Sequence, residues 1–88
     1  MLRQKLARLK DEHDEIIEEV RADGLMMGLK CRVPNTELID ACLKEKLLTI
    51  GAGDNVVRLI PPLIVTADDI SDAAARIDRA CRALSGQR

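Results

Sequence analysis

A hairpin signal near the middle of the chain constrains the fold more than any other feature of the sequence. Leu48-Thr49-Ile50 and residues 56–60 are short β-rich runs, and Gly51-Ala52-Gly53-Asp54-Asn55 between them has the composition of a hairpin loop. Pro61-Pro62 ends the second run because neither proline donates a backbone hydrogen bond. Residues 63–65 are expected to continue in an extended conformation. The sequence therefore predicts an antiparallel ladder on which the other elements pack.

A helix and a strand are expected before this hairpin. Apolar residues recur at helical spacing from the N-terminus, which predicts a helix over residues 2–12 within a leading segment 1–13. The helix is expected to end near His13 because the acidic residues that follow oppose the helix dipole. The chain then passes into an extended strand that carries residues 25–33. Gly28 inside that strand marks a bulge or a close approach of another backbone.

Two more helices are predicted farther along the chain. Asn35 is the expected N-cap of the first of them, which ends near Lys46. Thr66-Ala67-Asp68-Asp69 resembles a capping box with Asp in place of Glu, and an apolar stripe follows it to Leu84. Residues 85–88 are expected to fray. The predicted order α-β-α-β-β-α describes an α+β fold, with helices packed on a small, mostly antiparallel sheet of three or four strands.

Composition and charge exclude several classes of partner. The 88 residues allow one small domain, and with 0% aromatic residues its core must be built from Leu, Ile, Val, Met and Ala. Because the net charge is −1 and no ring is available to stack on a base, nucleic acid is not an expected partner. The longest apolar run, residues 59–65, is too short to span a membrane. The start at Met1 has no signal-peptide pattern, so we expect a cytoplasmic protein.

The cysteines and the glycine-rich loop do not indicate a catalytic or metal site. Cys31, Cys42 and Cys81 form no CxxC pair, and the sequence has one histidine, His13, so clustered zinc ligands are not expected. We interpret the cysteines as buried or half-buried free thiols of a reducing compartment. Gly51-Ala52-Gly53 is followed by a strand, whereas a phosphate-binding loop leads into a helix. This loop is therefore interpreted as a hairpin turn.

Arg58 is the residue that the hairpin pattern does not explain. It lies within Val56-Val57-Arg58-Leu59-Ile60, where a half-buried strand normally carries a hydrophobic or a small polar side chain. Arginine is almost never fully buried unless it is paired, and its planar guanidinium suits a carboxylate in bidentate geometry. Three explanations remain open: a structural ion pair, an edge strand from which the side chain reaches solvent, and a clamp for a ligand carboxylate.

Two stretches of the sequence resemble one enzyme family. Residues 20–29 (VRADGLMMGL) and residues 47–63 (LLTIGAGDNVVRLIPPL), followed by Val65-Thr66 and an acidic helix start, closely resemble the C-terminal end of the class III aminotransferases. The resemblance covers the chain from the first helix to Leu84. This sequence departs from the family at Ala22, where glycine is usual, and in having no aromatic residue in the segment before it.

The resemblance implies a pyridoxal-phosphate enzyme of fold type I, a homodimer that moves an amino group from an amino acid to a 2-oxo acid. In the family, the lysine that forms the Schiff base and most cofactor contacts lie in a large domain outside the region of resemblance. The lysines of this chain do not fall at a matching motif: Lys5, Lys10, Lys30, Lys44 and Lys46. The 88 residues alone are therefore expected neither to hold pyridoxal phosphate nor to turn over substrate.

One residue role carries over from the family. The arginine of the family's NVVRLIPPL-like strand grips the α-carboxylate of the substrate, and Arg58 occupies that position. The amino donor stays open, because the contacts that select it lie in the large domain. Two other classes of function remain: a non-catalytic module that dimerises through the face of Leu2, Leu6 and Leu9, and a regulatory domain that binds an amino acid through Arg58 alone.

Overall fold

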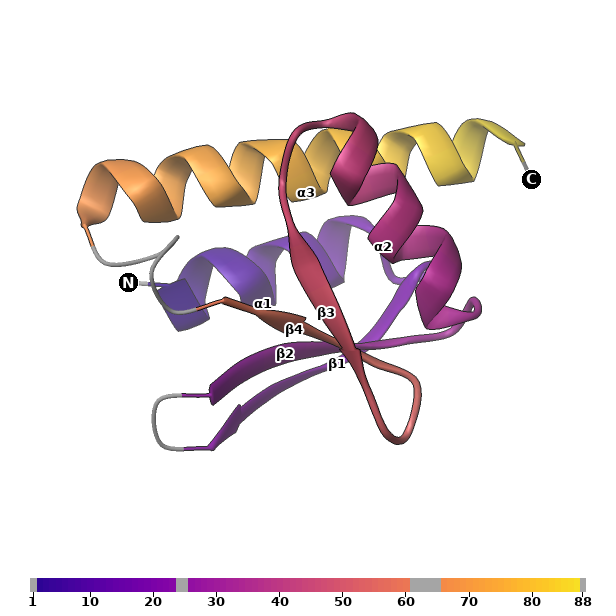
Figure 1. The fold of residues 1–88 in the computed structure, drawn as a ribbon, viewed down its shortest axis with the longest axis horizontal. Coiled ribbons are helices and arrows are strands. Elements are labelled where there is room, and N and C mark those ends of the chain that lie inside the picture. The colour runs from indigo at the N-terminus through magenta and orange to yellow at the C-terminus, as the bar shows by residue number, and fades with distance from the viewer. Residues whose placement is uncertain (1, 24–25, 61–65, 88) are drawn as a thin grey trace.

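The computed structural model describes residues 2–23, 26–60 and 66–87, which form a layer of helices on an antiparallel sheet (Figure 1). The predicted α+β class is confirmed, although the element order is α-β-β-α-β-β-α. The predictions for residues 61–65 lie outside the described residues. The elements are α1 (Leu2–Glu12), β1 (Ile17–Asp23), β2 (Met26–Cys31), α2 (Asn35–Lys44), β3 (Thr49–Ala52), β4 (Val56–Leu59) and α3 (Ala67–Gln87).

The described strands form one sheet in the order β1-β2-β4-β3, and each neighbouring pair is antiparallel. The predicted hairpin is confirmed as β3–β4, with Ala52 opposite Val56 next to the turn. A second hairpin, β1–β2, lies beside it, and α2 connects the two (Figure 1). Because β2 and β4 pair with each other, β4 is an inner strand, and β1 and β3 are the edges.

The hydrophobic core lies between one face of this sheet and the helices. Leu29, Val57 and Leu59 of the sheet are buried in one cluster with apolar residues of α1, α2 and α3. Leu6 and Leu9 belong to that cluster, so the face of α1 that we considered for dimerisation is already used within the chain. The largest fully buried side chains are Leu6, Ile16, Ile17, Leu29, Leu38, Ile77, Val57, Cys42 and Cys81. The predicted aliphatic core is confirmed.

Strand β1 is the element that the sequence analysis missed, because glutamate is uncommon in strands and Glu18 and Glu19 lie in this segment. In the structure the carboxylate of Glu18 lies 3.5 Å from Nζ of Lys30 on β2 and 3.8 Å from a guanidinium nitrogen of Arg32. Cross-strand pairs of opposite charge stabilise a sheet. The segment is a strand because β2 pairs with it, and Lys30 of β2 and Arg32 just after β2 offset the charge of Glu18, which the pattern of the segment itself does not show.

The start of α3 follows the prediction, and its end does not. Oγ1 of Thr66 accepts a hydrogen bond from the backbone N–H of Asp69 at 3.0 Å, and Oδ2 of Asp69 accepts one from the N–H of Thr66 at 3.2 Å, which confirms the capping box. The helix then continues to Gln87, past the point where the sequence predicts fraying. Neither α3 nor any other helix of the described residues combines the length and apolar character needed to cross a membrane.

The prediction of Asn35 as an N-cap is wrong. Pro34 occupies the N-cap position, and Asn35 is the first residue of α2, which ends at Lys44 rather than near Lys46. The side chain of Asn35 turns to the hairpin instead, where its Nδ2 donates to the carbonyl oxygen of Val56 at 3.0 Å. A side chain that binds distant carbonyl oxygens is not available to cap its own helix.

Asn55 joins three segments at the β3–β4 turn. Its backbone has a φ of 60°, a left-handed conformation that asparagine tolerates better than most residues. Its Nδ2 donates to the carbonyl oxygens of Cys31 at 2.8 Å and Val33 at 2.7 Å, and its Oδ1 accepts from the N–H of Asn35 at 2.7 Å. The end of β2, the start of α2 and the turn that leads into β4 are therefore held by one side chain.

We expect Asn55→Ala to lower the free energy of unfolding by about 2–4 kcal/mol, because three hydrogen bonds are lost and alanine is unfavourable at a positive φ. Urea denaturation of the 88-residue chain measures this change. The matched control is Gly53→Ala in the same turn, where an added Cβ meets nothing within 4 Å. An Asn55→Ala chain as stable as the control would contradict the role of this side chain.

Candidate functional site

Arg58 lies in the centre of the sheet. Its strand pairs on both sides, with Arg58 opposite Gly28 of β2 and opposite Ile50 of β3. The explanation of Arg58 as an edge-strand residue is therefore wrong, because β4 is an inner strand. Its side chain is half-buried. Two backbone ladders thus fix the position of this arginine, which suits a residue that must present its guanidinium in one place.

Alternation along β4 separates the two faces of the sheet. Val57 and Leu59 point into the core below the helices, so Val56 and Arg58 point to the opposite side. We call this side the open face, since the core cluster with α1, α2 and α3 lies on the other one. By register, Gly28 and Ile50 share the open face with Arg58.

Gly28 makes room for the side chains of β4 on the open face. A Cβ atom there would lie 2.7 Å from Cγ1 of Val56, 3.3 Å from the carbonyl oxygen of Val57 and 3.9 Å from Cγ of Arg58. The predicted close approach at this glycine is confirmed. The glycine therefore leaves room for Val56 and for the backbone of β4, while the stem of Arg58 lies at ordinary van der Waals distance from this position.

Charged side chains occupy the β1–β2 half of the open face. A carboxylate oxygen of Asp54, in the β3–β4 turn, lies 2.5 Å from a guanidinium nitrogen of Arg21 and 3.4 Å from Nζ of Lys30. The hydrogen bond from Arg21 is the main reason that the pKa of Asp54 lies below its usual value, and the same bond raises the pKa of Arg21. These ion pairs tie the turn before β4 to both strands of the other hairpin.

His13 forms a hydrogen bond that the sequence analysis did not find. The imidazole is buried, and its Nε2 lies 2.7 Å from Oδ1 of Asp78 on α3. Glu12 completes a group of three potential metal ligands whose ligand atoms lie within 4.8 Å of one another. Both carboxylates already have cationic partners, since Arg82 contacts Asp78 at 3.1 Å and Arg8 contacts Glu12 at 3.4 Å. The group is thus accounted for as a link between α1 and α3.

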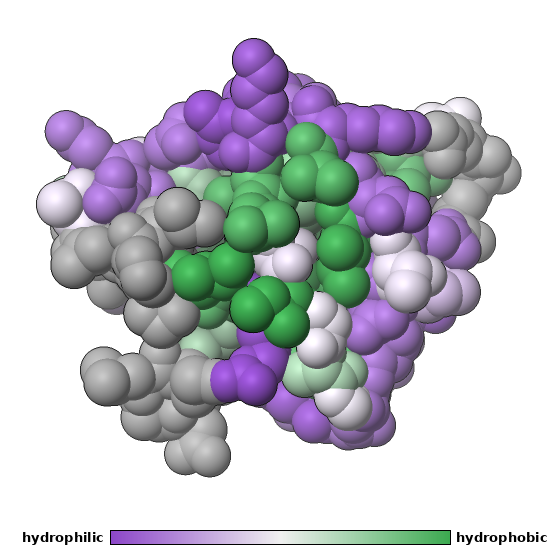
Figure 2. Space-filling view, in the orientation of Figure 1, coloured by the Kyte–Doolittle hydropathy of each residue, from purple (hydrophilic) through white to green (hydrophobic). Residues whose placement is uncertain are grey.

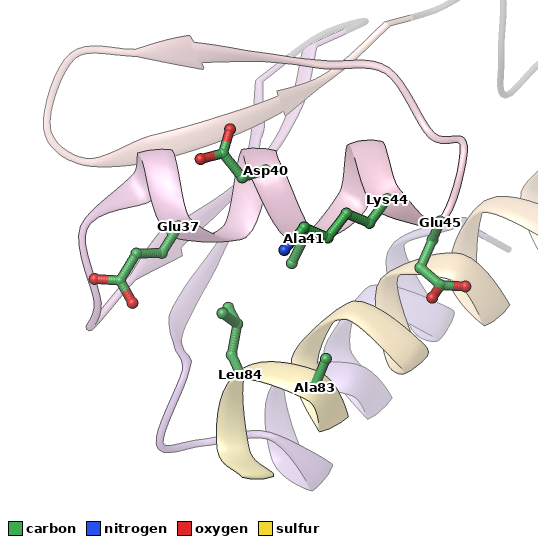
Figure 3. A pocket seen from close by; sticks show the side chains of 7 residues that line it. All are labelled: Glu37, Asp40, Ala41, Lys44, Glu45, Ala83 and Leu84. Atoms are coloured by element: carbon green, nitrogen blue, oxygen red, sulfur yellow. The ribbon is translucent and has the colours of Figure 1, made fainter. Parts of the chain in front are cut away.

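A pocket of about 260 Å³ lies between α2 and the C-terminal part of α3 (Figure 3). None of the residues that line it belongs to the sheet, so it is separate from Arg58. One of its carboxylates, on Glu45, lies 2.6 Å from Nε of Arg79. The pocket is lined by Glu37, Asp40, Ala41, Lys44, Glu45, Ala83 and Leu84.

The cysteines are buried and free, as predicted. Burial disfavours the thiolate, and this raises the pKa of Cys31 to about 11 and the pKa values of Cys42 and Cys81 to about 12. A thiol that stays protonated at neutral pH is a poor nucleophile. The cysteines therefore act as small apolar residues of the core.

Comparison with known proteins decides the family. A family-wide sequence profile described as Aminotransferase class-III matches residues 1–81. The chain belongs to the class III aminotransferases. This assignment agrees with the family resemblance of the motif around Arg58 and with the fold of a solved aminotransferase that matches this chain.

The relatives are considerably longer than this chain. It is 51% identical over its 88 residues to acetylornithine aminotransferase 1 of Bradyrhizobium diazoefficiens and 46% identical to acetylornithine aminotransferase of Agrobacterium fabrum. These alignments cover the whole chain and 22% of each relative. In the solved N-acetylornithine aminotransferase of Stenotrophomonas maltophilia, the match has a TM-score of 0.85 at 30% identity and covers 99% of this chain and 25% of that one. The chain therefore spans about a fifth to a quarter of the length of these proteins.

Two features around Arg58 were not found from the sequence. Arg21 lies in one of the two family-like stretches and Asp54 in the predicted turn, and their ion pair joins residues 33 positions apart in the chain. The close approach at Gly28 was predicted without its partner. The sequence feature that could have indicated both contacts is the presence of the two family-like stretches together. The described part of residues 20–29 lies in one hairpin and that of residues 47–63 in the other, and the two hairpins pair in one sheet.

We expect Gly28→Ala to lower the free energy of unfolding by about 1–3 kcal/mol, because an added methyl group overpacks the contact with Val56. Urea denaturation of the chain gives the change in free energy. The control is Gly86→Ala in α3, where a Cβ meets nothing within 4 Å and where alanine raises helix stability by up to about 1 kcal/mol. A Gly28→Ala chain as stable as wild type would contradict the crowding.

The cysteines generate a prediction about alkaline pH. Folding raises the pKa values of the three thiols above the ordinary 9.0, so the unfolded chain loses its thiol protons at a lower pH than the folded chain does. The stability that the protonated thiols contribute below about pH 9 is therefore lost as pH rises toward 12. Iodoacetamide should label the native chain at pH 8 at least about 100-fold more slowly than the chain in urea. Rapid labelling of the native chain would show that the thiols are accessible.

Proposed function

We infer that residues 1–88 are the C-terminal small domain of an acetylornithine aminotransferase, which transfers an amino group from N-acetylornithine to 2-oxoglutarate in arginine biosynthesis. The amino donor is proposed from the 51% and 46% identical relatives that bear this name. One observation supports the contribution of this chain: Arg58 stands on an inner strand with its side chain on the open face of the sheet. Its role is to bind the carboxylate of the substrate.

The surroundings of Arg58 suit this role physically. A guanidinium and a carboxylate form two parallel charge-assisted hydrogen bonds, which orient the bound molecule as well as hold it. The backbone at Arg58 is fixed by pairing with β2 and β3, so binding requires little rearrangement of the protein. Gly28 opposite Arg58 leaves room for Val56, which shares the open face of β4 with Arg58. The chain therefore contributes orientation of the substrate.

Pyridoxal phosphate supplies the electron sink for amino-group transfer in this family, and we propose that the missing part of the enzyme binds it. Lys30 lies on the sheet, on strand β2. Its Nζ is 3.5 Å from a carboxylate oxygen of Glu18 and 3.4 Å from one of Asp54, so its ammonium group takes part in ion pairs. The family resemblance places the Schiff-base lysine in the large domain, outside this chain. We therefore expect the 88 residues alone to be inactive and to need the large domain.

The assembled enzyme is proposed to be a cytoplasmic homodimer. Its substrates are an amino acid and a 2-oxo acid, with no role for nucleic acid or membrane. Related donors, namely succinylornithine, ornithine and 4-aminobutyrate, are alternatives for the same site, because the part of the enzyme that contacts the distal group of the donor lies outside this chain.

The test uses a chimera in which residues 1–88 replace the matching segment of acetylornithine aminotransferase 1 of Bradyrhizobium diazoefficiens. We expect active transaminase, with N-acetylornithine preferred over the three other donors. Arg58→Ala and Arg58→Lys should each lower kcat/KM roughly 30-fold to 1000-fold, which corresponds to a loss of about 2–4 kcal/mol in transition-state binding. Arg8→Ala, at an exposed arginine of α1 that pairs with Glu12, is the matched control.

A normal kcat/KM in the Arg58→Ala chimera would refute the carboxylate role. Preference for another donor would retain the family role and replace N-acetylornithine by that donor. Absorbance of bound pyridoxal phosphate, followed in the same preparations, separates loss of the cofactor from loss of substrate binding.

A further inference from the structure

Strand β4 is short, and its hydrophobic pattern does not by itself fix its place along β2. A shift of β4 by two residues would leave every side chain on its own face of the sheet, because successive side chains alternate. Such a shift would carry Arg58 about 7 Å along the strand. The observed register pairs Gly28 with Arg58, Leu29 with Val57 and Lys30 with Val56.

Strand β3, the other neighbour of β4, is placed against its own hydrophobic pattern. Thr49 is buried, and its hydroxyl group has no hydrogen-bond partner among the described residues. Leu48 and Ile50 on either side of it are 59% and 54% exposed, and Figure 2 shows apolar side chains gathered on the face on which β3 lies. A shift by one residue would turn the two apolar side chains toward the core and the threonine away from it. Burial alone therefore favours a different register, so polar contacts have to hold the observed one.

Asn55 supplies such contacts directly before β4. Its backbone carbonyl oxygen accepts a hydrogen bond from the N–H of Cys31 at 3.0 Å, and its side-chain Nδ2 donates to the carbonyl oxygen of Cys31 at 2.8 Å. One residue thus binds both backbone polar groups of Cys31 at the end of β2. A shift of β4 in either direction would break both bonds and leave backbone groups of a buried residue without partners, which is unfavourable.

Asn35 on α2 binds both ends of the β3–β4 turn. Its Nδ2 donates to the carbonyl oxygen of Val56 at 3.0 Å and to that of Ala52 at 3.4 Å. Its backbone N–H donates to Oδ1 of Asn55 at 2.7 Å. We call Asn35 and Asn55 the amide pair. Because Ala52 ends β3 and Val56 begins β4, the amide pair fixes both strands relative to α2, whose Leu38 is packed into the core.

We propose that Asn55, supported by Asn35, is a positioning residue of the transaminase: it holds the register of β4 and thereby places the guanidinium of Arg58 where it binds the substrate carboxylate. The inference rests on the proposed function. The side chain of Asn55 is bound to backbone groups of Cys31, Val33 and Asn35, so it acts on the reaction through Arg58. Placement matters because a displacement of about 1 Å in a substrate-positioning group can lower a rate about 100-fold.

A double-mutant cycle in the chimera described above tests this role. Asn55→Gly removes the side chain and keeps a residue that adopts a positive φ without strain. We expect kcat/KM to fall at least about tenfold when Arg58 is present and to change less than about twofold in the Arg58→Ala background, because a positioning residue has no effect once the group that it positions is removed. A merely structural role would give the same loss in both backgrounds.

Two further variants separate positioning from stability. Ile77→Val, in the buried core of α3, is the matched control, because it lowers the free energy of unfolding and should leave the kcat/KM of the chimera unchanged. Asn35→Ala removes the contacts of Nδ2 with the turn and leaves Asn55 in place. It should lower kcat/KM by a smaller factor than Asn55→Gly, again when Arg58 is present, so it completes the cycle if Asn55→Gly does not fold.

Hydrogen exchange measures the hold on β4 without using activity. The peptide with residues 56–60 of the chimera, followed by mass spectrometry, should exchange at least about tenfold faster in Asn55→Gly than in wild type. Unchanged exchange would overturn the proposal, and so would faster exchange with an unchanged kcat/KM or an equal loss of kcat/KM in the two Arg58 backgrounds. A normal kcat/KM in the Arg58→Ala chimera would instead reject the proposed function itself.

Discussion

The position of Arg58 depends on how the β3–β4 turn is anchored, and Asn55 supplies that anchor. Its side chain binds the carbonyl oxygens at the end of β2 and an N–H at the start of α2 while its own backbone is left-handed. In the opposite direction, the side chain of Asn35 on α2 donates a hydrogen bond to the carbonyl oxygen of Val56 on β4. Two amide side chains thus connect the first hairpin, the helix and the second hairpin. This connection adds to the ladders, the core packing of Val57 and Leu59 and the ion pairs of Asp54 in holding β4 beside β2.

The two faces of the sheet carry different groups of residues. One face is consumed by the aliphatic core, which has to be complete because the chain has no aromatic side chain to add buried area. The other face carries an ion-pair network around Asp54, the bare backbone of Gly28 and the guanidinium of Arg58. Placing Arg58 on this face keeps its charge out of the core, where an arginine would need a fully matched partner.

Local signals predicted much of the fold. The turn composition of residues 51–55 and the capping box at Thr66 each depend on a few neighbouring residues, and both were found correctly. Strand β1 and the role of Asn35 were missed, because they depend on partners distant in the chain: Lys30 for the carboxylate of Glu18 and the hairpin carbonyl oxygens for Asn35. Propensity describes a segment in isolation, whereas these segments are stabilised by other parts of the chain.

The sequence by itself determined the α+β class, the aliphatic core, the family motif and Arg58 as an arginine in need of an anionic partner. Only the tertiary structure decided that Arg58 lies on an inner strand, opposite Gly28 and Ile50 and on the face away from the helices. The physical reason is the pairing of strands. Alternation tells which residues share a side, but which side is buried and which residues meet across it depend on the register between strands far apart in the chain.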